Sequence, residues 1–334
     1  MVRFGLIGLG EWARTVHIPN LLRLPEAQIA ALASRSEGRL DAGRAAAGAH
    51  HPRLYTDYRE LLKDPDLDAV IVCTPNATHE AITLEALEAG KHVLCEKPLS
   101  FTREGCERVA EAARRANRVF QVGLELRYAD VSARLRELIE QGVVGTPRMA
   151  RCLIWRDWGG PKGWRADQES SGGIYLELAV HYLDLLDWLV GGGPALIFSV
   201  GGRVLGPEIT DHLWTTLSYE AGAQVNLGIC VFAPAENLIP VEIVGDRGRI
   251  AADIITGRVE LWHRGSSDFK LASPDRPVDY RFDGFPGSLE SLAGFITSIK
   301  ARTPPLAGID AASRATILAL AAQQSESSGH PARV

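Results

Sequence analysis

The sequence lacks the features that mark several classes of protein. Its 334 residues carry 36 lysines and arginines against 41 aspartates and glutamates, so no basic excess is available to neutralise nucleic-acid phosphates. Five cysteines form no C-x-x-C pair and no metal-ligand spacing, which favours free thiols in a reducing compartment. Nowhere do 18 apolar residues follow one another, and the amino end shows no secretion signal. These absences predict a cytoplasmic protein without a metal site that binds neither nucleic acid nor membranes.

The composition is otherwise that of a globular protein. Glycine (33) and proline (18) are too few for a collagen-like or disordered chain, and 46% of the residues are hydrophobic. The length predicts about two domains.

The first third of the chain alternates short apolar runs with helical patterns. The apolar runs fall at 2–7, 29–33, 68–73, 92–95 and 118–122. Continuous apolar strands separated by helices predict a parallel sheet covered on both faces, and hence an α/β fold.

The pattern changes after about residue 123. Helices are predicted near 128–141, 172–190, 287–300 and 310–323, and the last of them leads into a polar tail, 325–329, that we expect to be frayed. Strands are predicted near 196–205, 212–220, 223–232, 240–245, 248–254 and 258–263. Consecutive strands joined by short turns predict a largely antiparallel sheet.

The first strand leads directly into a glycine turn, G-x-G-x-x-A, which begins at Gly8 and ends at Ala13. Gly8 permits the tight turn, and Gly10 lets the backbone approach a pyrophosphate at the N-terminus of the next helix. Glu11 and Trp12 lie inside the same turn. We therefore predict that Gly8, Gly10, Glu11 and Trp12 bind a dinucleotide.

The end of the second strand bears on the choice of cofactor. NAD sites place an acidic residue there to accept the ribose 2′-hydroxyl, but this strand ends in Ser34 and Arg35. Arg35 can pair with a 2′-phosphate, whereas Glu37, three residues after Ser34, would favour NAD. The missing acid predicts that NADP is preferred, with NAD as the alternative.

Several motifs are similar to those of a known family. Residues 74–80 read TPNATHE, and residues 90–98 read GKHVLCEKP. A glycine pair at 172–173 precedes ELAVHYLD at 177–184, and residues 241–248 read VEIVGDRG. Together these resemble the Gfo/Idh/MocA family of oxidoreductases over most of the chain. The resemblance implies a Rossmann domain, 1–123, and an α+β domain, 124–334, whose open and mostly antiparallel sheet forms a homo-oligomer, a dimer or a tetramer.

The resemblance makes Lys97 a catalytic residue beside the nicotinamide. Lys97 follows the carboxyl end of a predicted strand, where ligands bind in open α/β sheets. His181 and Glu177 are four residues apart on a predicted helix, so they share a face. A histidine can take the proton from a sugar hydroxyl, and His181 is the predicted proton carrier. Relatives usually carry aspartate where this chain has Glu177, the third predicted catalytic residue.

The remaining candidates are assigned by the same resemblance. Further predicted cofactor contacts are Thr74, Pro75, Asn76, His79, Glu96, Lys97 and Arg127. For the substrate, the predicted contacts are Lys97, Asp157, Trp158, Trp164 and His181, since indole faces pack against sugar C–H surfaces and polar groups bind hydroxyls.

The predicted function is hydride transfer between nicotinamide and a sugar, polyol or related hydroxy or keto compound. Two alternatives are an NAD-dependent glycosidase of the same family and a non-catalytic regulator that senses a dinucleotide. The presence of Lys97 and His181 argues against the non-catalytic regulator.

Overall fold

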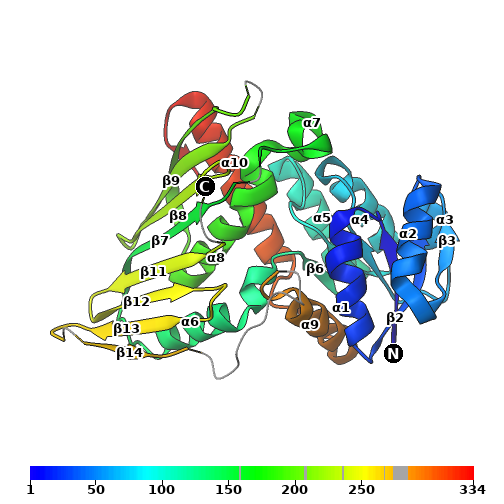
Figure 1. The fold of residues 1–334 in the computed structure, drawn as a ribbon, viewed down its shortest axis with the longest axis horizontal. Coiled ribbons are helices and arrows are strands. Elements are labelled where there is room, and N and C mark those ends of the chain that lie inside the picture. The colour runs from blue at the N-terminus through cyan, green and yellow to red at the C-terminus, as the bar shows by residue number, and fades with distance from the viewer. Residues whose placement is uncertain (158, 207–208, 235–236, 267, 274–284) are drawn as a thin grey trace. The chain divides into compact units, whose positions relative to one another are not determined.

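The computed structural model describes residues 1–334 except for 158, 207–208, 235–236, 267 and 274–284. The chain divides into two compact units (Figure 1). One comprises Met1–Tyr128 with Tyr280–Thr316, and the other Ala129–Asp279 with Ile317–Val334. The first unit thus includes Tyr280–Thr316, which the predicted division after residue 123 assigns to the second domain.

The described residues of the first unit form a six-stranded parallel sheet in the order β3-β2-β1-β4-β5-β6. Its strands are β1 (Val2–Ile7), β2 (Ala27–Ala33), β3 (Arg53–Tyr55), β4 (Ala69–Val72), β5 (His92–Cys95) and β6 (Phe120–Val122). All but β3 coincide with the predicted apolar runs. β3 has three residues, too few for hydrophobic periodicity to reveal it.

Helices cover both faces of this sheet. They are η1 (Ala13–His17), α1 (Ile18–Arg23), α2 (Glu37–Ala47), η2 (Gly48–His50), α3 (Tyr58–Leu62), η3 (Asn76–Thr78), α4 (His79–Glu88), α5 (Arg103–Ala116), η4 (Glu125–Tyr128) and α9 (Ser288–Ala301). Because crossovers are right-handed and the strand order reverses between β1 and β4, α1 and α2 cover one face and α4 and α5 the other. Leu292, Phe295 and Ile296 bring α9 into the core beside α1.

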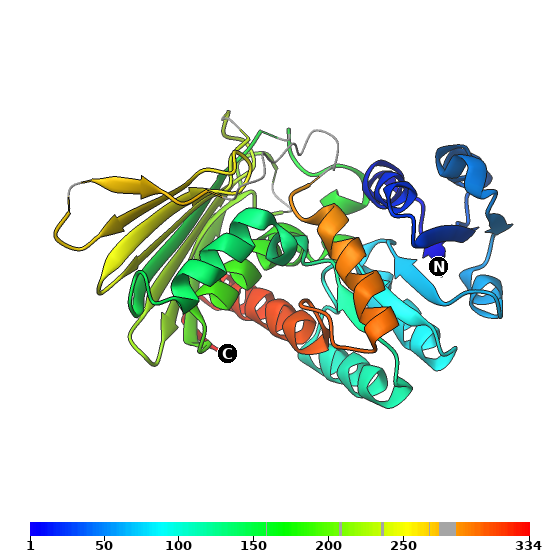
Figure 2. The same cartoon turned by 90° about the horizontal axis from the view of Figure 1, so that it is seen from below.

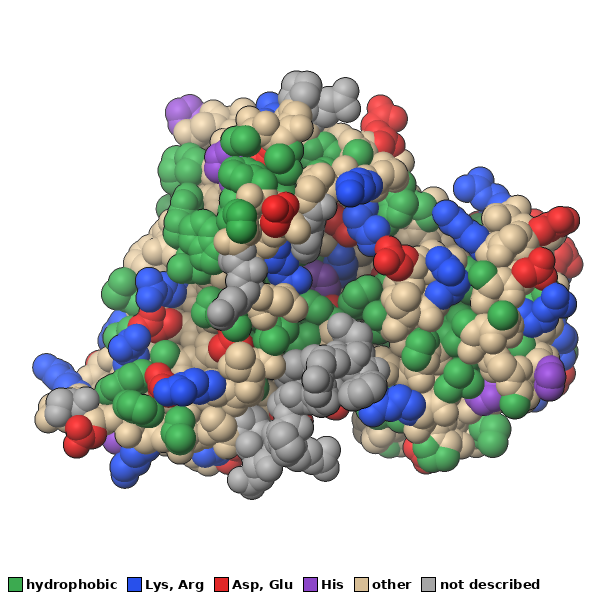
Figure 3. Space-filling model, viewed as in Figure 1, with side chains coloured by type: hydrophobic (Ala, Val, Ile, Leu, Met, Phe, Trp, Pro, Cys, Tyr) green, Lys and Arg blue, Asp and Glu red, His purple; other side chains and the backbone are tan. Residues whose placement is uncertain are grey.

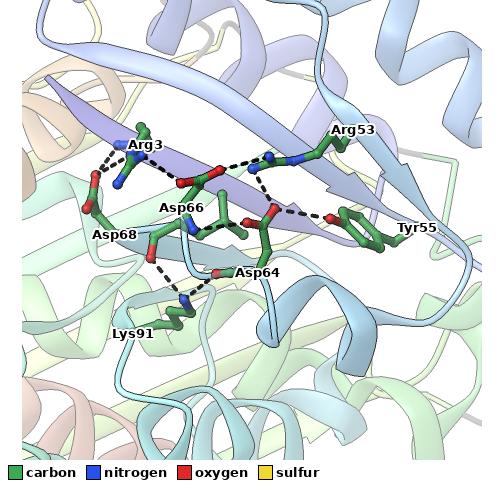
Figure 4. A network of polar contacts seen from close by, with 8 residues as sticks. Arg3, Arg53, Tyr55, Asp64, Asp66, Asp68 and Lys91 are labelled. Carbon is green, nitrogen blue, oxygen red and sulfur yellow. Dashed lines mark hydrogen bonds and ion pairs between the residues drawn. The ribbon is translucent and has the colours of Figure 1, made fainter.

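A polar network ties the amino ends of β1 and β3 to the loop before β4 (Figure 4). Lys91 Nζ donates to the carbonyl oxygens of Asp64 at 2.7 Å and Leu67 at 3.0 Å. Arg53 pairs with the carboxylates of Asp64 and Asp66. Burial lowers the pKa of Lys91. The glycine turn lies at the opposite end of β1. Lys91, which belongs to the G-K-H sequence, therefore stabilises the fold and does not bind a ligand there.

The described residues of the second unit form a nine-stranded sheet in the order β14-β13-β12-β11-β7-β10-β9-β8-β15. Its strands are β7 (Pro147–Trp155), β8 (Pro194–Gly202), β9 (His212–Tyr219), β10 (Gln224–Cys230), β11 (Pro240–Gly245), β12 (Gly248–Asp253), β13 (Val259–His263), β14 (Phe269–Leu271) and β15 (Ala332–Arg333). β7 and β10 pair in parallel, and the other neighbours are antiparallel. The predicted fold class is confirmed, although β7, β14 and β15 were not expected.

Helices pack against one face of the second sheet (Figure 2), with α6 on β12 and α8 on β7 and β10. The helices of this part of the chain are α6 (Asp130–Glu140), η5 (Gly163–Ala166), α7 (Gln168–Ser171), η6 (Tyr175–Ala179), α8 (Val180–Val190) and α10 (Ile309–Ser328). The prediction of a frayed tail is wrong. Ser325 is buried and its hydroxyl accepts the Ser199 N–H at 3.0 Å, while β15 pairs with β8. Within the described ranges, no helix is both long and apolar enough to cross a bilayer.

Candidate active site

The predicted cofactor residues of the first unit follow the carboxyl ends of its strands. The glycine turn follows β1, and the turn that begins at Thr74 follows β4. β1 and β4 are neighbours at the point where the strand order reverses. In open α/β sheets this reversal leaves a crevice in which ligands bind, so the fold brings these two turns to one position.

The glycine turn fits a dinucleotide. Gly8 has a φ of +91°, and a Cβ there would lie 2.4 Å from the carbonyl oxygen of Cys73. Around Gly10, no described atom lies within 4 Å of the position of a Cβ. The backbone at Gly10 therefore faces open space, which is what the close approach of a pyrophosphate requires.

The turn after β2 is built from serines. Ser34 Oγ accepts the Ser36 N–H at 3.3 Å, and Ser36 Oγ caps α2 by accepting the Arg39 N–H at 3.4 Å. The side chain of Arg35 is exposed. This turn presents a cation and small hydroxyl groups where NAD-specific sites present a carboxylate.

The turn after β4 is held by hydrogen bonds of its own. Thr78 Oγ1 contacts Thr74 Oγ1 and the Pro75 carbonyl oxygen, each at 2.7 Å, and Asn76 is buried. The fully buried ring of His79 places Nε2 2.9 Å from the Thr74 carbonyl oxygen.

The other ring nitrogen of His79, Nδ1, lies 2.8 Å from the Pro98 carbonyl oxygen. Burial lowers the pKa of His79, while the two carbonyl acceptors act in the opposite direction. Both ring nitrogens thus face backbone carbonyls, so the contacts of His79 connect two loops. Its role as a cofactor contact stays a prediction.

Glu96 is buried at the end of β5 and receives hydrogen bonds from the helix that follows the glycine turn. Trp12 Nε1 donates to Glu96 Oε1 at 3.0 Å, and His17 Nε2 lies 2.7 Å from the same oxygen. Burial raises the pKa of the Glu96 carboxyl, but the His17 hydrogen bond and the charge of Lys97 outweigh burial and lower it overall. Glu96 is therefore an ionised carboxylate that connects β5 to the glycine turn.

His17 is a residue that sequence reasoning missed. It is buried and lies one helical turn after Ala13, the last residue of the glycine motif. A histidine at that spacing on an otherwise apolar helix face is the signal that could have identified it.

Lys97 and Arg127 complete the predicted cofactor residues of the first unit. Lys97 is half-buried between Glu96 and Pro98, and the Lys97–Pro98 peptide bond is cis. Arg127 lies in η4 after β6, where its side chain is buried and Nη1 donates to the Leu306 carbonyl oxygen at 3.4 Å.

The predicted helix at 172–190 starts later than expected and begins irregularly. Gly172 and Gly173 have φ values of +75° and +78°, which end α7 and prevent a continuous helix. Glu177 then lies in the π-helix η6, and His181 in the first turn of α8, where its side chain is 8% exposed. The regular i, i+4 spacing assumed from the sequence therefore does not hold across this segment.

Glu177 forms an ion pair that the sequence did not predict. Arg165 Nε donates to Glu177 Oε1 at 2.7 Å, and the guanidinium lies 4.7 Å from the centre of the Trp164 ring. Asp157 Oδ1 accepts the Gly159 N–H at 3.0 Å. The predicted contact Trp158 lies outside the described residues. Glu177, Arg165 and Trp164 thus form one cluster in the second unit.

Two family models match this chain. Residues 2–124 match the model described as an oxidoreductase family with an NAD-binding Rossmann fold. Residues 132–251 match the model of the GFO/IDH/MocA C-terminal domain.

Several similar proteins are dehydrogenases by name. A myo-inositol 2-dehydrogenase of Thermotoga maritima is 29% identical over 97% of this chain and 96% of its own length. An inositol 2-dehydrogenase/D-chiro-inositol 3-dehydrogenase of Shouchella clausii is 32% identical over 75% of this chain and 71% of its own. Among solved structures, a probable dehydrogenase from Thermotoga maritima superposes with a TM-score of 0.83 and 28% identity, covering 99% of this chain and 98% of that one.

Proposed function

The chain belongs to the Gfo/Idh/MocA family and is an NAD(P)-dependent oxidoreductase, and we propose that Lys97, His181 and Glu177 form its catalytic set for a sugar or polyol substrate. One observation carries this proposal. Glu96, the residue before Lys97, accepts a hydrogen bond from Trp12 in the glycine turn. The turn that bears Lys97 therefore adjoins the turn built for a dinucleotide.

Lys97 binds and polarises the reacting oxygen in this proposal. When bound, the nicotinamide supplies the hydride acceptor or donor at the carbinol carbon. A positive ammonium group hydrogen-bonds an alcohol oxygen and stabilises the negative charge that develops on it. The positive charge of Lys97 in turn helps to lower the pKa of the buried Glu96 carboxyl, since opposite charges stabilise each other strongly in a poorly solvated place.

His181 is the proposed proton carrier. An imidazole can take the hydroxyl proton near neutral pH and return it in the reverse direction. Its position in the first turn of α8 places it next in the chain to the cluster of Glu177, Arg165 and Trp164. We assign substrate hydroxyl binding to that cluster and to Asp157, with Trp164 supplying an apolar surface for sugar C–H groups.

The names of the relatives extend the proposal to cyclic polyols. Those in Thermotoga maritima and Shouchella clausii are named for the oxidation of inositols. Myo-inositol is therefore the first substrate to assay, followed by aldoses and keto sugars.

NADP is the proposed preferred form of the cofactor. The exposed Arg35 and the absence of an acid at Ser34 support it, because a 2′-phosphate needs a cation and repels a carboxylate. Titration with NADPH and NADH, followed by quenching of tryptophan fluorescence, tests this choice. Tighter binding of NADH would contradict it.

Lys97→Ala tests the catalytic assignment. We expect turnover to fall on the order of 10²-fold or more, as loss of an acid–base group does, while dinucleotide affinity falls at most about 10-fold, as loss of one contact does. Steady-state rates and the same fluorescence titration measure both quantities. Turnover close to that of the wild type would exclude Lys97 as a catalytic residue.

A homo-oligomer formed through the second sheet is also part of this proposal. On the face opposite α6 and α8, apolar side chains are exposed, and Figure 3 shows hydrophobic side chains gathered over β8 and β9. The exposed apolar residues of β7, β8 and β9 are Met149, Trp155, Leu196, Phe198, Val200 and Trp214. An apolar patch of this kind marks a protein–protein contact.

The free thiols of all five cysteines support a cytoplasmic location.

A further inference from the structure

The turn that carries Lys97 is contacted on both flanks by a buried histidine. His17 contacts the carboxylate of Glu96, the residue before Lys97, and His79 contacts the carbonyl oxygen of Pro98, the residue after it. We propose that His17 and His79 are positioning residues that hold Lys97 in its reactive placement. The proposal rests on the role assigned to Lys97 above.

The contact of His17 holds Glu96 in one orientation. Glu96 Oε1 receives Trp12 Nε1 at 3.0 Å and lies 2.7 Å from His17 Nε2. Its second oxygen, Oε2, would be only 2.5 Å from a Cβ at Gly123, so this carboxylate fills the space that the glycine leaves. A carboxylate enclosed on these sides cannot swing away, and the backbone of residue 96 is held with it.

The partners of the His17 ring determine which of its two nitrogens donates a hydrogen bond. A carboxylate only accepts hydrogen bonds, so His17 Nε2 must donate. In the described structure, the buried Nδ1 of His17 has no hydrogen-bond partner. Nε2 is therefore the nitrogen through which this side chain acts.

The contact of His79 holds the other flank of Lys97. Its ring is fully buried, and Nδ1 lies 2.8 Å from the Pro98 carbonyl oxygen while Nε2 lies 2.9 Å from that of Thr74. A carbonyl oxygen also only accepts, and a neutral imidazole carries only one N–H. We assign this proton to Nδ1, whose contact is the shorter of the two, so that Nδ1 donates to Pro98 and restrains it.

These contacts connect the Lys97 turn to the two loops at the point where the strand order reverses. Through Glu96 and His17, residue 96 is held to the helix after the glycine turn, and through His79, the first residue of α4, residue 98 is held to the helix that follows the Thr74 turn. Lys97 is thereby placed relative to both loops that the dinucleotide contacts in the proposed function. Since catalysis is sensitive to displacements of about 1 Å, release of either flank should reduce turnover more than binding.

The two histidines act through different ring nitrogens, and this allows a matched test. The glutamine amide nitrogen occupies the place of Nε2, and the asparagine amide nitrogen that of Nδ1. His17→Gln keeps the bond to Glu96, whereas His17→Asn loses it. At the second site His79→Asn keeps the bond to Pro98, whereas His79→Gln loses it.

We expect a crossed pattern in kcat, measured with myo-inositol or whichever sugar gives the highest rate in the substrate screen. His17→Gln and His79→Asn should stay within about threefold of the wild type, and His17→Asn and His79→Gln should fall about 10-fold or more. Dinucleotide Kd from fluorescence titration should change less than about threefold in both His17 variants. Neither side-chain size nor general loss of stability produces opposite orders at the two sites.

Equal effects of Asn and Gln at both sites, or losses of kcat that follow the melting temperatures, would overturn the proposal and leave the histidines purely structural. Lys97→Ala, assayed in parallel, separates this claim from the proposed function. If Lys97→Ala is inactive but the crossed pattern is absent, only the positioning role fails. If Lys97→Ala is fully active, the proposed function fails, and the positioning role fails with it.

Discussion

Gly8 and Gly10 belong to the same turn but are surrounded differently. A Cβ on Gly8 would collide with the Cys73 carbonyl oxygen at 2.4 Å, and its φ of +91° is costly for any other residue. A Cβ on Gly10 would meet no described atom within 4 Å. The fold therefore requires the first glycine, whereas no described atom excludes a side chain at the second, where we expect the bound dinucleotide to do so.

Alanine substitutions should separate these two requirements. Gly8→Ala should reduce the free energy of unfolding by roughly 1–2 kcal/mol or more, because the left-handed backbone and the collision with Cys73 both oppose it. Gly10→Ala should leave the melting temperature unchanged but raise the dinucleotide Kd about 10-fold or more, as a methyl group would obstruct the pyrophosphate. Thermal melts and fluorescence titrations measure both effects. Unaltered binding by Gly10→Ala would contradict the assignment of the open space to the cofactor.

The resemblance predicts an aspartate where this chain has Glu177, and the contact of Glu177 with Arg165 gives a use for the extra methylene group. Glu177→Asp withdraws the carboxylate from Arg165 Nε, now 2.7 Å away. We expect KM for the sugar or polyol to rise about 3- to 10-fold, the effect of losing a hydrogen bond of about 1 kcal/mol. The exposed Glu169 on α7 offers a control with the same chemical change, and Glu169→Asp should leave KM unaltered. An unchanged KM in Glu177→Asp would remove the cluster from the substrate site.

Two helices that contain or adjoin predicted site residues include a π-helical turn. One is η1 (Ala13–His17), which follows the glycine turn, and the other is η6 (Tyr175–Ala179), which carries Glu177. π-helical turns are rare and occur often at functional sites. Hydrophobic periodicity predicts that a helix exists but not how many residues its first turn contains. The direction of Glu177 relative to His181 was therefore beyond the sequence.

Strand β5 contains a histidine whose ring serves as an acceptor. His92 Nδ1 accepts the Val119 N–H at 2.9 Å, just before β6. Burial, followed by the positive charge of Arg118, lowers the pKa of His92. The folded protein therefore binds this proton less readily than the unfolded chain does.

Stability should fall in acid for this reason. With a histidine pKa of about 6.5 in the unfolded chain and a lower one in the folded protein, stability is full above about pH 6.5 and is lost as the pH falls. The buried His79 contributes in the same direction. His92→Asn keeps an acceptor near the position of Nδ1 but does not titrate. Melting temperatures between pH 7.5 and 5 should depend less on pH in this variant, and an unchanged slope would contradict the assignment.

At the scale of the whole molecule, the open face of the second sheet should decide assembly. The apolar exposed residues of β8 and β9, with Phe198 and Trp214 among them, would be unfavourable in water unless covered by another copy. Phe198→Lys should shift the protein to the monomer in size-exclusion chromatography or analytical ultracentrifugation. The matched control is Leu271→Lys on the edge strand β14, which should retain the wild-type size. A monomeric wild type would exclude assembly through this face.

Local patterns in the sequence determined much of this protein. The glycine turn and the alternation of strands and helices in the first third could be read directly, because backbone geometry and burial impose short periods on the residues. The Glu96-Lys97-Pro98 turn was singled out by the family resemblance. The resemblance carried by these motifs identified the family. The short strands β3, β14 and β15 were missed because two or three residues are too few to show a period, and the nine-residue strand β7 was missed as well.

Only the tertiary structure decided which distant residues meet. His17 reaches Glu96 across 79 positions, and β15 returns from the end of the chain to pair with β8. The ion pair of Arg165 with Glu177 depends on the irregular turn at Gly172 and Gly173. Such contacts follow from how elements pack, and packing depends on the shapes and volumes of many side chains at once. The sequence pattern therefore indicated which chemical groups this protein carries, and the tertiary structure determined which of these groups support Lys97.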